Sequence, residues 1–224
     1  MPDRDVHPIG AVILDIDGTL IDSNPLHALA WLRAFRRLGH EVEAGRILDL
    51  MGMGGDKLAP AILGDDSSAE CEQARAFWAE EYSAKGLIEH AEPLPGAVDL
   101  LRSLKDRGLR VALASSGERS DVERYVALLG RNHVDEVVTS DDVEATKPSP
   151  DIFAAALDRL GHPRTAWAVG DTPYDVDAAR AVGLPCLAVL TGGVSRARLE
   201  AAGAAAVCAG AAEVLEELDR RIGS

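Results

Sequence analysis

Cysteine is scarce in this chain, and its spacing excludes two common uses. Only three cysteines occur in 224 residues, Cys71, Cys186 and Cys208, and no Cys-x-x-Cys pair is present. An odd number of widely spaced cysteines supports neither a disulfide framework nor a zinc site. We therefore expect all three to be structural thiols.

Positive charge is also in short supply. The chain has 23 Lys and Arg against 37 Asp and Glu, which gives a formal net charge of -14. Proteins that follow nucleic-acid phosphates need clustered Lys and Arg, and the basic residues here are dispersed. We therefore expect no nucleic acid as a partner.

Long apolar runs are missing as well. No run approaches the roughly 18 apolar residues that span a bilayer, and Met1 to Gly10 has charges but no apolar signal-peptide core. We expect a cytoplasmic protein without a membrane partner. Its alanine-rich helices and acidic surface suit a monomer or a homodimer.

What the chain does have is an alternation of strand-like apolar runs and amphipathic helical stretches. With 47% hydrophobic residues it can bury a substantial core. The alternation predicts the α/β fold class, with a parallel sheet wrapped by helices. The expected strands are Ala11 to Leu14, Arg110 to Ala114, Glu136 to Thr139, Thr165 to Val169, Cys186 to Leu190 and Ala205 to Cys208.

The alternation is broken once, between about residues 23 and 91, where no convincing strand occurs. Segments rich in residues that end regular structure flank this stretch, at 22–25 and 92–96. We therefore predict a helical insert over residues 23–92, in a core formed by residues 1–22 and 93–224. Its expected helices are Leu26 to Leu38, Arg46 to Met51, Lys57 to Leu63 and Glu70 to Tyr82.

Four aspartates directly follow two of the expected strands. Asp15 and Asp17 come after the first strand, and Gly18 permits a turn that brings both carboxylates to one site. Asp171 leaves a later strand, and Asp175 lies about one helical turn further on. Because open parallel sheets bind ligands at such strand ends, we expect one site there.

Clustered carboxylates repel one another and raise their pKa values unless a cation lies among them, and hard oxygen ligands favour Mg2+. A carboxylate beside Mg2+ can attack phosphorus, while a second carboxyl protonates the leaving oxygen and later activates water. Asp15 and Asp17 fit these roles in that order. The plainer alternative, that the acids only end a strand and cap a helix, is most open for Asp171, since Asp is a good N-cap.

Two further segments suit a phosphoryl site. Ser115 and Ser116 end another expected strand and open a helix, so hydroxyl and backbone amide groups there suit phosphate oxygens. Lys147 precedes a proline, which favours extended backbone, and a lysine held there would neutralise phosphate and carboxylate charge. Each segment taken alone is equally explained as ordinary loop chemistry.

Together these segments resemble the haloacid dehalogenase (HAD) superfamily of hydrolases, in the phosphoglycolate phosphatase-like subfamily with a small helical C1 cap. The resemblance spans about residues 11–190, and the joint pattern is highly specific. The matching positions are Asp15-Ile-Asp-Gly-Thr-Leu20 for the first motif, Ser115 for the second, Lys147 for the third and Gly170-Asp-Thr-Pro-Tyr-Asp175 for the fourth.

The resemblance implies a Rossmann-like core with strand order 5-4-1-2-3, and a cap that opens for substrate and closes against water. The metal ligands it implies are the carboxylates of Asp15 and Asp171 and the backbone carbonyl of Asp17, with support from Asp175. The phosphate-binding residues expected with it are Gly18, Ser115, Ser116 and Lys147.

Within the superfamily, Asp17 separates several alternatives. Dehalogenases attack carbon and carry no Asp at this place, and phosphonatases have a small residue there. A sugar phosphomutase of the β-phosphoglucomutase type is the closest rival, because His27 matches a histidine that helps position its acid/base. However, Met51 to Gly55 has glycine where those mutases place an arginine. Hydrolysis is favoured, with His27, Gly54 and Gly55 as candidate substrate contacts from the cap.

A catalytically silent module that binds phospho-ligands is the alternative of another class, and the intact motifs disfavour it. The sequence thus predicts a Mg2+-dependent phosphomonoester hydrolase that acts on a small phosphorylated metabolite through an aspartyl-phosphate on Asp15. The metabolite itself is not specified. The cap helices show no arginine or lysine constellation that would indicate a second anionic group on the substrate.

Overall fold

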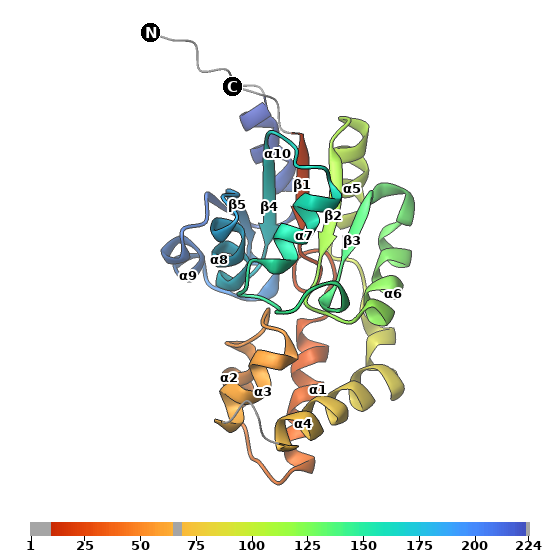
Figure 1. The fold of residues 1–224 in the computed structure, drawn as a ribbon, viewed down its shortest axis with the longest axis vertical. Coiled ribbons are helices and arrows are strands. Elements are labelled where there is room, and N and C mark those ends of the chain that lie inside the picture. Colours follow the sequence, from red (N-terminus) through yellow and green to blue (C-terminus); the bar gives the residue numbers. More distant parts are fainter. Residues whose placement is uncertain (1–9, 65–68, 223–224) are drawn as a thin grey trace.

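The computed structural model describes residues 10–64 and 69–222 of the chain. Figure 1 shows two lobes, one built on a sheet and one helical, with the strands running toward the helical lobe. The stretch considered above for a signal peptide falls on residues 1–9, outside the described residues. Every helix in the described ranges is too short or too polar to cross a membrane.

The sheet has six parallel strands, each within one residue of its predicted bounds. In space they follow the order β3-β2-β1-β4-β5-β6. The predicted order 5-4-1-2-3 therefore holds for the first five strands, with β6 added beside β5. Their bounds are β1 (Ala11–Leu14), β2 (Arg110–Ala114), β3 (Glu136–Val138), β4 (Ala166–Gly170), β5 (Cys186–Val189) and β6 (Ala206–Cys208).

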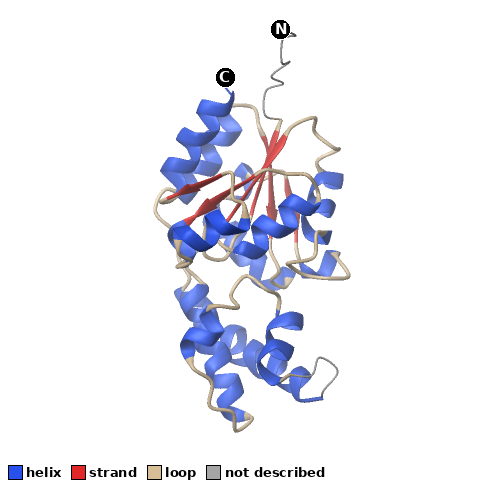
Figure 2. Cartoon of the chain, turned by 90° about the vertical axis from the view of Figure 1, so that its left-hand side faces the viewer, coloured by secondary structure: helices blue, strands red, loops and turns tan. Residues whose placement is uncertain are grey.

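Helices cover both faces of the sheet (Figure 2). Val12 and Leu14 of β1 share one apolar cluster with α5, α6 and α10, whereas Ala11 and Ile13 share another with α7 and α8. Burial on both faces explains why β1 is an uninterrupted apolar run. The helix bounds are α5 (Ala97–Asp106), α6 (Arg119–Leu129), α7 (Asp151–Arg159), α8 (Pro173–Ala181), α9 (Arg196–Ala202) and α10 (Ala211–Ile222).

The second lobe is helical throughout its described part and has its own apolar cluster, which includes Trp31, Phe35, Ile47 and Leu58. Cys71 also belongs to this cluster, and it is a buried thiol, as are the other two cysteines. The elements of the lobe are α1 (Asn24–Arg37), α2 (Ala44–Leu48), α3 (Gly55–Leu63), α4 (Ala69–Ala79), a π-helical turn η1 (Glu80–Ala84) and a 3-10 turn η2 (Leu87–His90).

The helix predicted over Glu70 to Tyr82 differs in its last turn. The α-helical part ends at Ala79, and the chain continues as the π-helical turn η1. A π turn holds more residues than an α turn and so reorients the side chains that follow. Here it buries Tyr82, whose hydroxyl hydrogen-bonds the hydroxyl of Tyr125 on α6 and so joins the two lobes.

Candidate active site

The turn after β1 brings Asp15 and Asp17 to the edge of the sheet that faces the helical lobe. Gly18 has φ of +74°, in the left-handed region that favours glycine. A Cβ atom at Gly18 would also overlap the side chains of Asn24 and Asp171. Glycine is therefore required here both for the turn and for the close approach of the neighbouring side chains.

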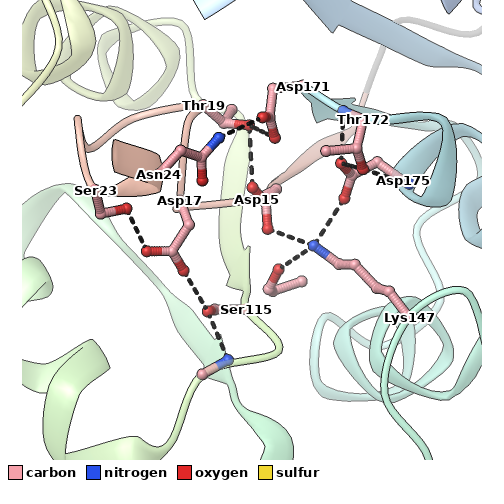
Figure 3. Close-up of polar contacts among 12 residues, drawn as sticks. Asp15, Asp17, Thr19, Ser23, Asn24, Ser115, Lys147, Asp171, Thr172 and Asp175 are labelled. Atoms are coloured by element: carbon pink, nitrogen blue, oxygen red, sulfur yellow. Dashed lines mark hydrogen bonds and ion pairs between the residues drawn. The ribbon is translucent and has the colours of Figure 1, made fainter. Parts of the chain in front are cut away.

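Lys147 ties Asp15 to the strand beside it (Figure 3). Its ammonium hydrogen-bonds Asp15 Oδ1, lies 2.7 Å from Asp175 Oδ1 and donates to the Ala114 carbonyl at 3.1 Å. The side chain is 1% exposed. Burial by itself would lower the pKa of Lys147, but the charges of Asp15 and Asp175 outweigh it and raise the pKa. Lys147 is thus a fixed positive charge at the end of β1.

Asp15, Asp171 and Asp175 form a buried acidic cluster. Each offers a carboxylate oxygen, and these oxygens lie within 4.8 Å of one another. Burial, followed by repulsion from Asp15 and Asp175, raises the pKa of Asp171 well above its ordinary value. Burial raises the pKa of Asp15 as well, against the opposing charge of Lys147. A set of hard oxygen donors whose mutual repulsion Lys147 only partly offsets fits a divalent cation.

Three residues that the sequence did not single out hold Asp171 in place. Asn24 Nδ2 donates to Asp171 Oδ2 at 3.1 Å, and Thr19 Oγ1 lies 3.2 Å from Asp171 Oδ1 and 3.1 Å from an oxygen of Asp15. A Cβ atom at Gly192 would overlap the Asp171 carboxylate. Thr19 lies inside the first motif, so its role could have been predicted from the sequence. Gly192 could not have been found in this way, because it approaches Asp171 from a distant segment of the chain.

Asp175 serves the helix as well as the cluster. Its Oδ2 accepts hydrogen bonds from the Thr172 amide at 3.0 Å and the Thr172 hydroxyl at 2.6 Å. Its own backbone amide donates to Thr172 Oγ1 at 3.3 Å, which completes a capping box at the start of α8. Its Oδ1 faces Lys147. A Cβ atom at Gly170 would overlap the Asp175 side chain. The N-cap of α8 is Thr172, so Asp171 is not the helix cap that the plainer alternative made it, whereas Asp175 completes the capping box and also belongs to the cluster.

The Asp17 carboxylate lies outside this cluster and has its own partners. Ser23 Oγ donates to Asp17 Oδ1 at 2.5 Å, and His27 Nε2 lies 2.9 Å from the same oxygen. Burial would raise the pKa of Asp17, but the charge of His27 and hydrogen bonds from His27 and Ser23 lower it. Asp17 is therefore held as a carboxylate beside an imidazole.

The two serines after β2 take different positions. Ser115 is fully buried, and its hydroxyl donates to Asp17 Oδ2 at 3.2 Å and accepts from the Gly117 amide at 3.0 Å. Ser116 lines the cavity described next, and its hydroxyl has no partner among the described residues. Ser116 thus presents a free hydroxyl at the cavity, while Ser115 orients Asp17.

A cavity of about 340 Å³ lies between the lobes. Asp15, Asp17 and Ser116 line it from the sheet side. The helical lobe contributes the three residues expected from the sequence and several that were not. Its lining residues from that lobe are Asn24, His27, Trp31, Met51, Gly52, Met53, Gly54, Gly55, Asp56, Arg75 and Trp78.

A parallel sheet of this order, with a buried acidic cluster at its strand ends and a helical lobe across the cavity, defines a Rossmann-like α/β protein with its candidate site at the carboxyl edge of the sheet. The family model of the haloacid dehalogenase-like hydrolases matches residues 9–183. The chain therefore belongs to the haloacid dehalogenase-like hydrolase family.

Three similar proteins share most of their length with this chain, whereas the chain spans only 18% of a longer relative, the Arabidopsis thaliana protein SUPPRESSOR OF QUENCHING 1. Fructose-1-phosphate phosphatase YqaB of Escherichia coli is 31% identical over 80% of the chain and 95% of its own length. Phosphoglycolate phosphatase of Rhodospirillum rubrum is 34% identical over 88% of the chain and 86% of its own. A hydrolase from Pseudomonas syringae of known structure covers 94% of the chain and 98% of its own, with 31% identity and a TM-score of 0.87. The chain is accordingly an HAD-type phosphatase.

Proposed function

We propose that this phosphatase is a Mg2+-dependent phosphomonoester hydrolase that acts on small phosphorylated metabolites through an aspartyl-phosphate on Asp15. One observation carries the proposal. Two aspartates only two residues apart have different environments, because Asp15 faces Lys147 in the acidic cluster whereas Asp17 is bound by Ser23 and His27. Separate environments suit separate roles for the two carboxylates.

Asp15 is the proposed nucleophile. Lys147 orients its carboxylate and neutralises charge as the phosphoryl group approaches, and Ser116 with the neighbouring amides receives the phosphoryl oxygens. Mg2+ would be held by Asp15, Asp171 and the Asp17 backbone carbonyl, with support from Asp175. When bound, the cation supplies charge neutralisation for both the carboxylates and the phosphoryl oxygens.

Asp17 is the proposed acid and base. It protonates the leaving oxygen in the first half of the reaction and takes a proton from the attacking water in the second. Because its neighbours lower the pKa of Asp17, it needs a proton donor for the first half. His27 Nε2, 2.9 Å from Asp17 Oδ1, is the group in place to deliver that proton.

We further propose that residues 23–92 act as a cap that excludes water during the reaction. Support comes from contacts between the lobes beside the cavity. Arg198 pairs with Asp49 at 2.6 Å, Tyr174 donates to the Asp49 carbonyl at 3.3 Å, and Thr146 donates to Asp56. A cytoplasmic location and a monomeric or homodimeric state stay predictions.

Hydrolysis of p-nitrophenyl phosphate tests the proposal. We expect phosphate release that requires MgCl2, stops with EDTA and is lost in Asp15→Asn. Acid quenching during turnover should trap a phosphoenzyme in the unsubstituted protein and none in Asp15→Asn. A well-folded, Mg2+-loaded protein that releases no phosphate from a broad panel of phosphate esters would contradict the proposal.

A sugar phosphomutase is the second candidate, and the contact between His27 and Asp17 favours it. Two features favour hydrolysis instead. Residues 51–55 have glycine where those mutases place an arginine, and Asp175 in the fourth motif falls where they carry a small residue. Interconversion of glucose 1-phosphate and glucose 6-phosphate without net phosphate release would decide for the mutase.

A further inference from the structure

The cap side of the cavity presents one strongly basic side chain. Arg75, on α4, is the single Lys or Arg among the described residues that line the cavity. Apart from His27, the other ionisable lining residues are acidic. They are Asp15, Asp17, Asp56, Glu118 and Glu144. A basic group in such surroundings would ordinarily pair with one of these carboxylates.

Arg75 nevertheless has no hydrogen-bond or ion-pair partner in the described part of the chain, although it is half-buried. Three other arginines of the same lobe do have partners. Arg33 pairs with Glu81 at 3.3 Å, Arg37 with Glu80 at 2.8 Å, and Arg46 donates to a carbonyl at 3.0 Å. Leaving a partly desolvated guanidinium unpaired costs free energy. A half-buried charge left in this state is a reason to look for a ligand.

The local packing keeps Arg75 at the cavity wall. A Cβ atom built on Gly55 would lie 3.7 Å from Arg75 Cδ and 3.2 Å from the Trp31 ring. The absence of a side chain at Gly55 therefore leaves space for the aliphatic part of Arg75 and for the Trp31 ring. Asp56, the acidic residue that the helical lobe itself contributes to the cavity wall, is engaged by the Thr146 hydroxyl of the other lobe.

The acidic residues of the other lobe do not neutralise Arg75 either. Glu118 and Glu144 are solvent-exposed, and neither has an ion-pair partner among the described residues. Arg75 is therefore available to a ligand in the cavity, at a wall formed by α4 rather than by the strand ends that carry Asp15.

We propose that Arg75 binds a second anionic group, a carboxylate or a phosphate, at the end of the substrate remote from the reacting phosphoryl group. The inference rests on the proposed function, because it takes the phosphoryl group to sit at Asp15. A planar guanidinium fork matches either anion through two parallel hydrogen bonds. A cavity of about 340 Å³ is small for a ligand pocket, so the substrate is a compact phosphate ester that is anionic at both ends.

The test compares substrates that share a carbon skeleton. 3-Phosphoglycerate and glycerol 3-phosphate differ in a carboxylate against a hydroxymethyl group, and fructose 1,6-bisphosphate and fructose 1-phosphate differ in the second phosphate. We expect kcat/KM to favour the member that carries the second anionic group in at least one pair. The favoured pair identifies which anion Arg75 binds.

In Arg75→Gln that preference should fall roughly ten- to a hundredfold, the range of a charge-assisted hydrogen bond, mainly through KM. Arg75→Lys should restore part of it. Arg36→Gln is the matched control, because Arg36 is an exposed arginine of the same lobe without a partner among the described residues, and it should leave the ratio unchanged. A general loss of stability in Arg75→Gln would lower both rates and leave their ratio intact.

An unchanged ratio in Arg75→Gln, or no preference in the unsubstituted protein, would overturn the role of Arg75 while leaving hydrolysis in place. Calorimetry on Asp15→Asn keeps the two proposals apart. Tighter binding of 3-phosphoglycerate than of glycerol 3-phosphate, lost when Arg75→Gln is added, supports the anion site even without turnover. Equal binding of the two compounds, and of the two fructose phosphates, counts against it.

Discussion

The imidazole of His27 holds the Asp17 carboxylate from the first helix of the helical lobe. Its Nε2 lies 2.9 Å from Asp17 Oδ1, and its ring stacks 4.0 Å from the ring of Tyr82, which in turn hydrogen-bonds Tyr125 of the sheet lobe. The position of Asp17 is therefore set by both lobes, although Asp17 itself follows the first strand of the sheet.

If His27 passes a proton to Asp17, replacing it should matter most when the leaving group is poor. In His27→Gln we expect kcat to fall about tenfold with glycerol 3-phosphate and less with p-nitrophenyl phosphate, whose leaving group needs little protonation. Asp17→Asn should lose about 10²- to 10⁴-fold with the alkyl ester. Steady-state kinetics on both substrates checks this.

His40→Gln is the control for this prediction, since His40 lies in the same lobe and pairs with Glu70 at 2.8 Å with 41% of its side chain exposed. It should change neither rate by more than about twofold. An equal loss with both substrates in His27→Gln would assign His27 to folding or binding instead.

Asp171→Asn should lower the activity and raise the thermal stability of the protein. In metal-free protein it removes one member of a buried, mutually repelling cluster. The Asn oxygen can still accept from Asn24, and its amide can donate to Thr19 Oγ1, whose own hydrogen then goes to Asp15. We expect unfolding to cost about 1 kcal/mol more, seen as a melting midpoint roughly 2–4 °C higher. MgCl2 should raise the midpoint of the unsubstituted protein by mass action and that of the variant much less.

Thermal denaturation with EDTA, MgCl2 or NaCl of matched ionic strength measures both effects. An equal rise of both midpoints with MgCl2 would place the cation elsewhere. A lower midpoint for Asp171→Asn in EDTA would show that the hydrogen bonds of Asp171 outweigh the repulsion.

Acid stability should depend on Asp142, in the 3-10 turn after β3. Burial alone would raise the pKa of Asp142, but hydrogen bonds from Thr139 and the Arg159 guanidinium lower it to about 2, from an ordinary value of 3.8. The folded protein therefore takes up this proton less readily than the unfolded chain. The resulting contribution, about 2 kcal/mol, is present above pH 4 and is lost as the pH falls to about 2.

Asp142→Asn should accordingly be less stable than the unsubstituted protein at pH 7, and the gap should close near pH 2. Urea denaturation across that range measures it. Asp106→Asn, at an exposed aspartate, serves as the control and should show little difference at either pH. A gap that persists unchanged at pH 2 would exclude the ionised carboxylate as its cause.

Gly54→Ala should impair the approach of the two lobes. A Cβ atom there would overlap the Thr146 hydroxyl and the Asp56 carboxylate, which bond each other across the cavity edge. We expect kcat/KM to fall at least tenfold, because the lobes would have to separate, while the melting midpoint changes little. Gly45→Ala in the same lobe, where a Cβ atom meets nothing within 4 Å, should retain full activity. Equal activity of the two variants would contradict a tight contact at Gly54.

The six strands could be predicted from the sequence because their apolar runs reflect burial on both faces, as for Val12 and Ile13. The π-helical last turn of the helix expected to end at Tyr82 could not be predicted from the sequence. A single π turn is too short to produce a recognisable spacing of hydrophobic residues. Its cause is the packing of Tyr82 against His27 and Tyr125, which are distant in sequence.

The positions of the site residues divide in the same way. Motif residues such as Asp15 and Lys147 stand out as residue types that are rarely buried without a partner. The sequence does not distinguish Ser115 from Ser116. Of the two, Ser116 lines the cavity and Ser115 bonds Asp17, because successive side chains leave the end of β2 in different directions. No sequence pattern marked Arg75 as a ligand-binding residue, because an arginine on an amphipathic helix is ordinarily solvated.

The sequence by itself determined that a parallel sheet would form and that four aspartates would stand at its strand ends, because these properties depend on local periodicity and on the order of residues along the chain. Only the tertiary structure decided which partner each acid has and that Asp17 would lie with His27 rather than in the acidic cluster. It also decided that Arg75 would reach the cavity with no ion-pair partner in residues 10–64 and 69–222. Those outcomes are distances between side chains far apart in sequence, and they are set by how the lobes pack.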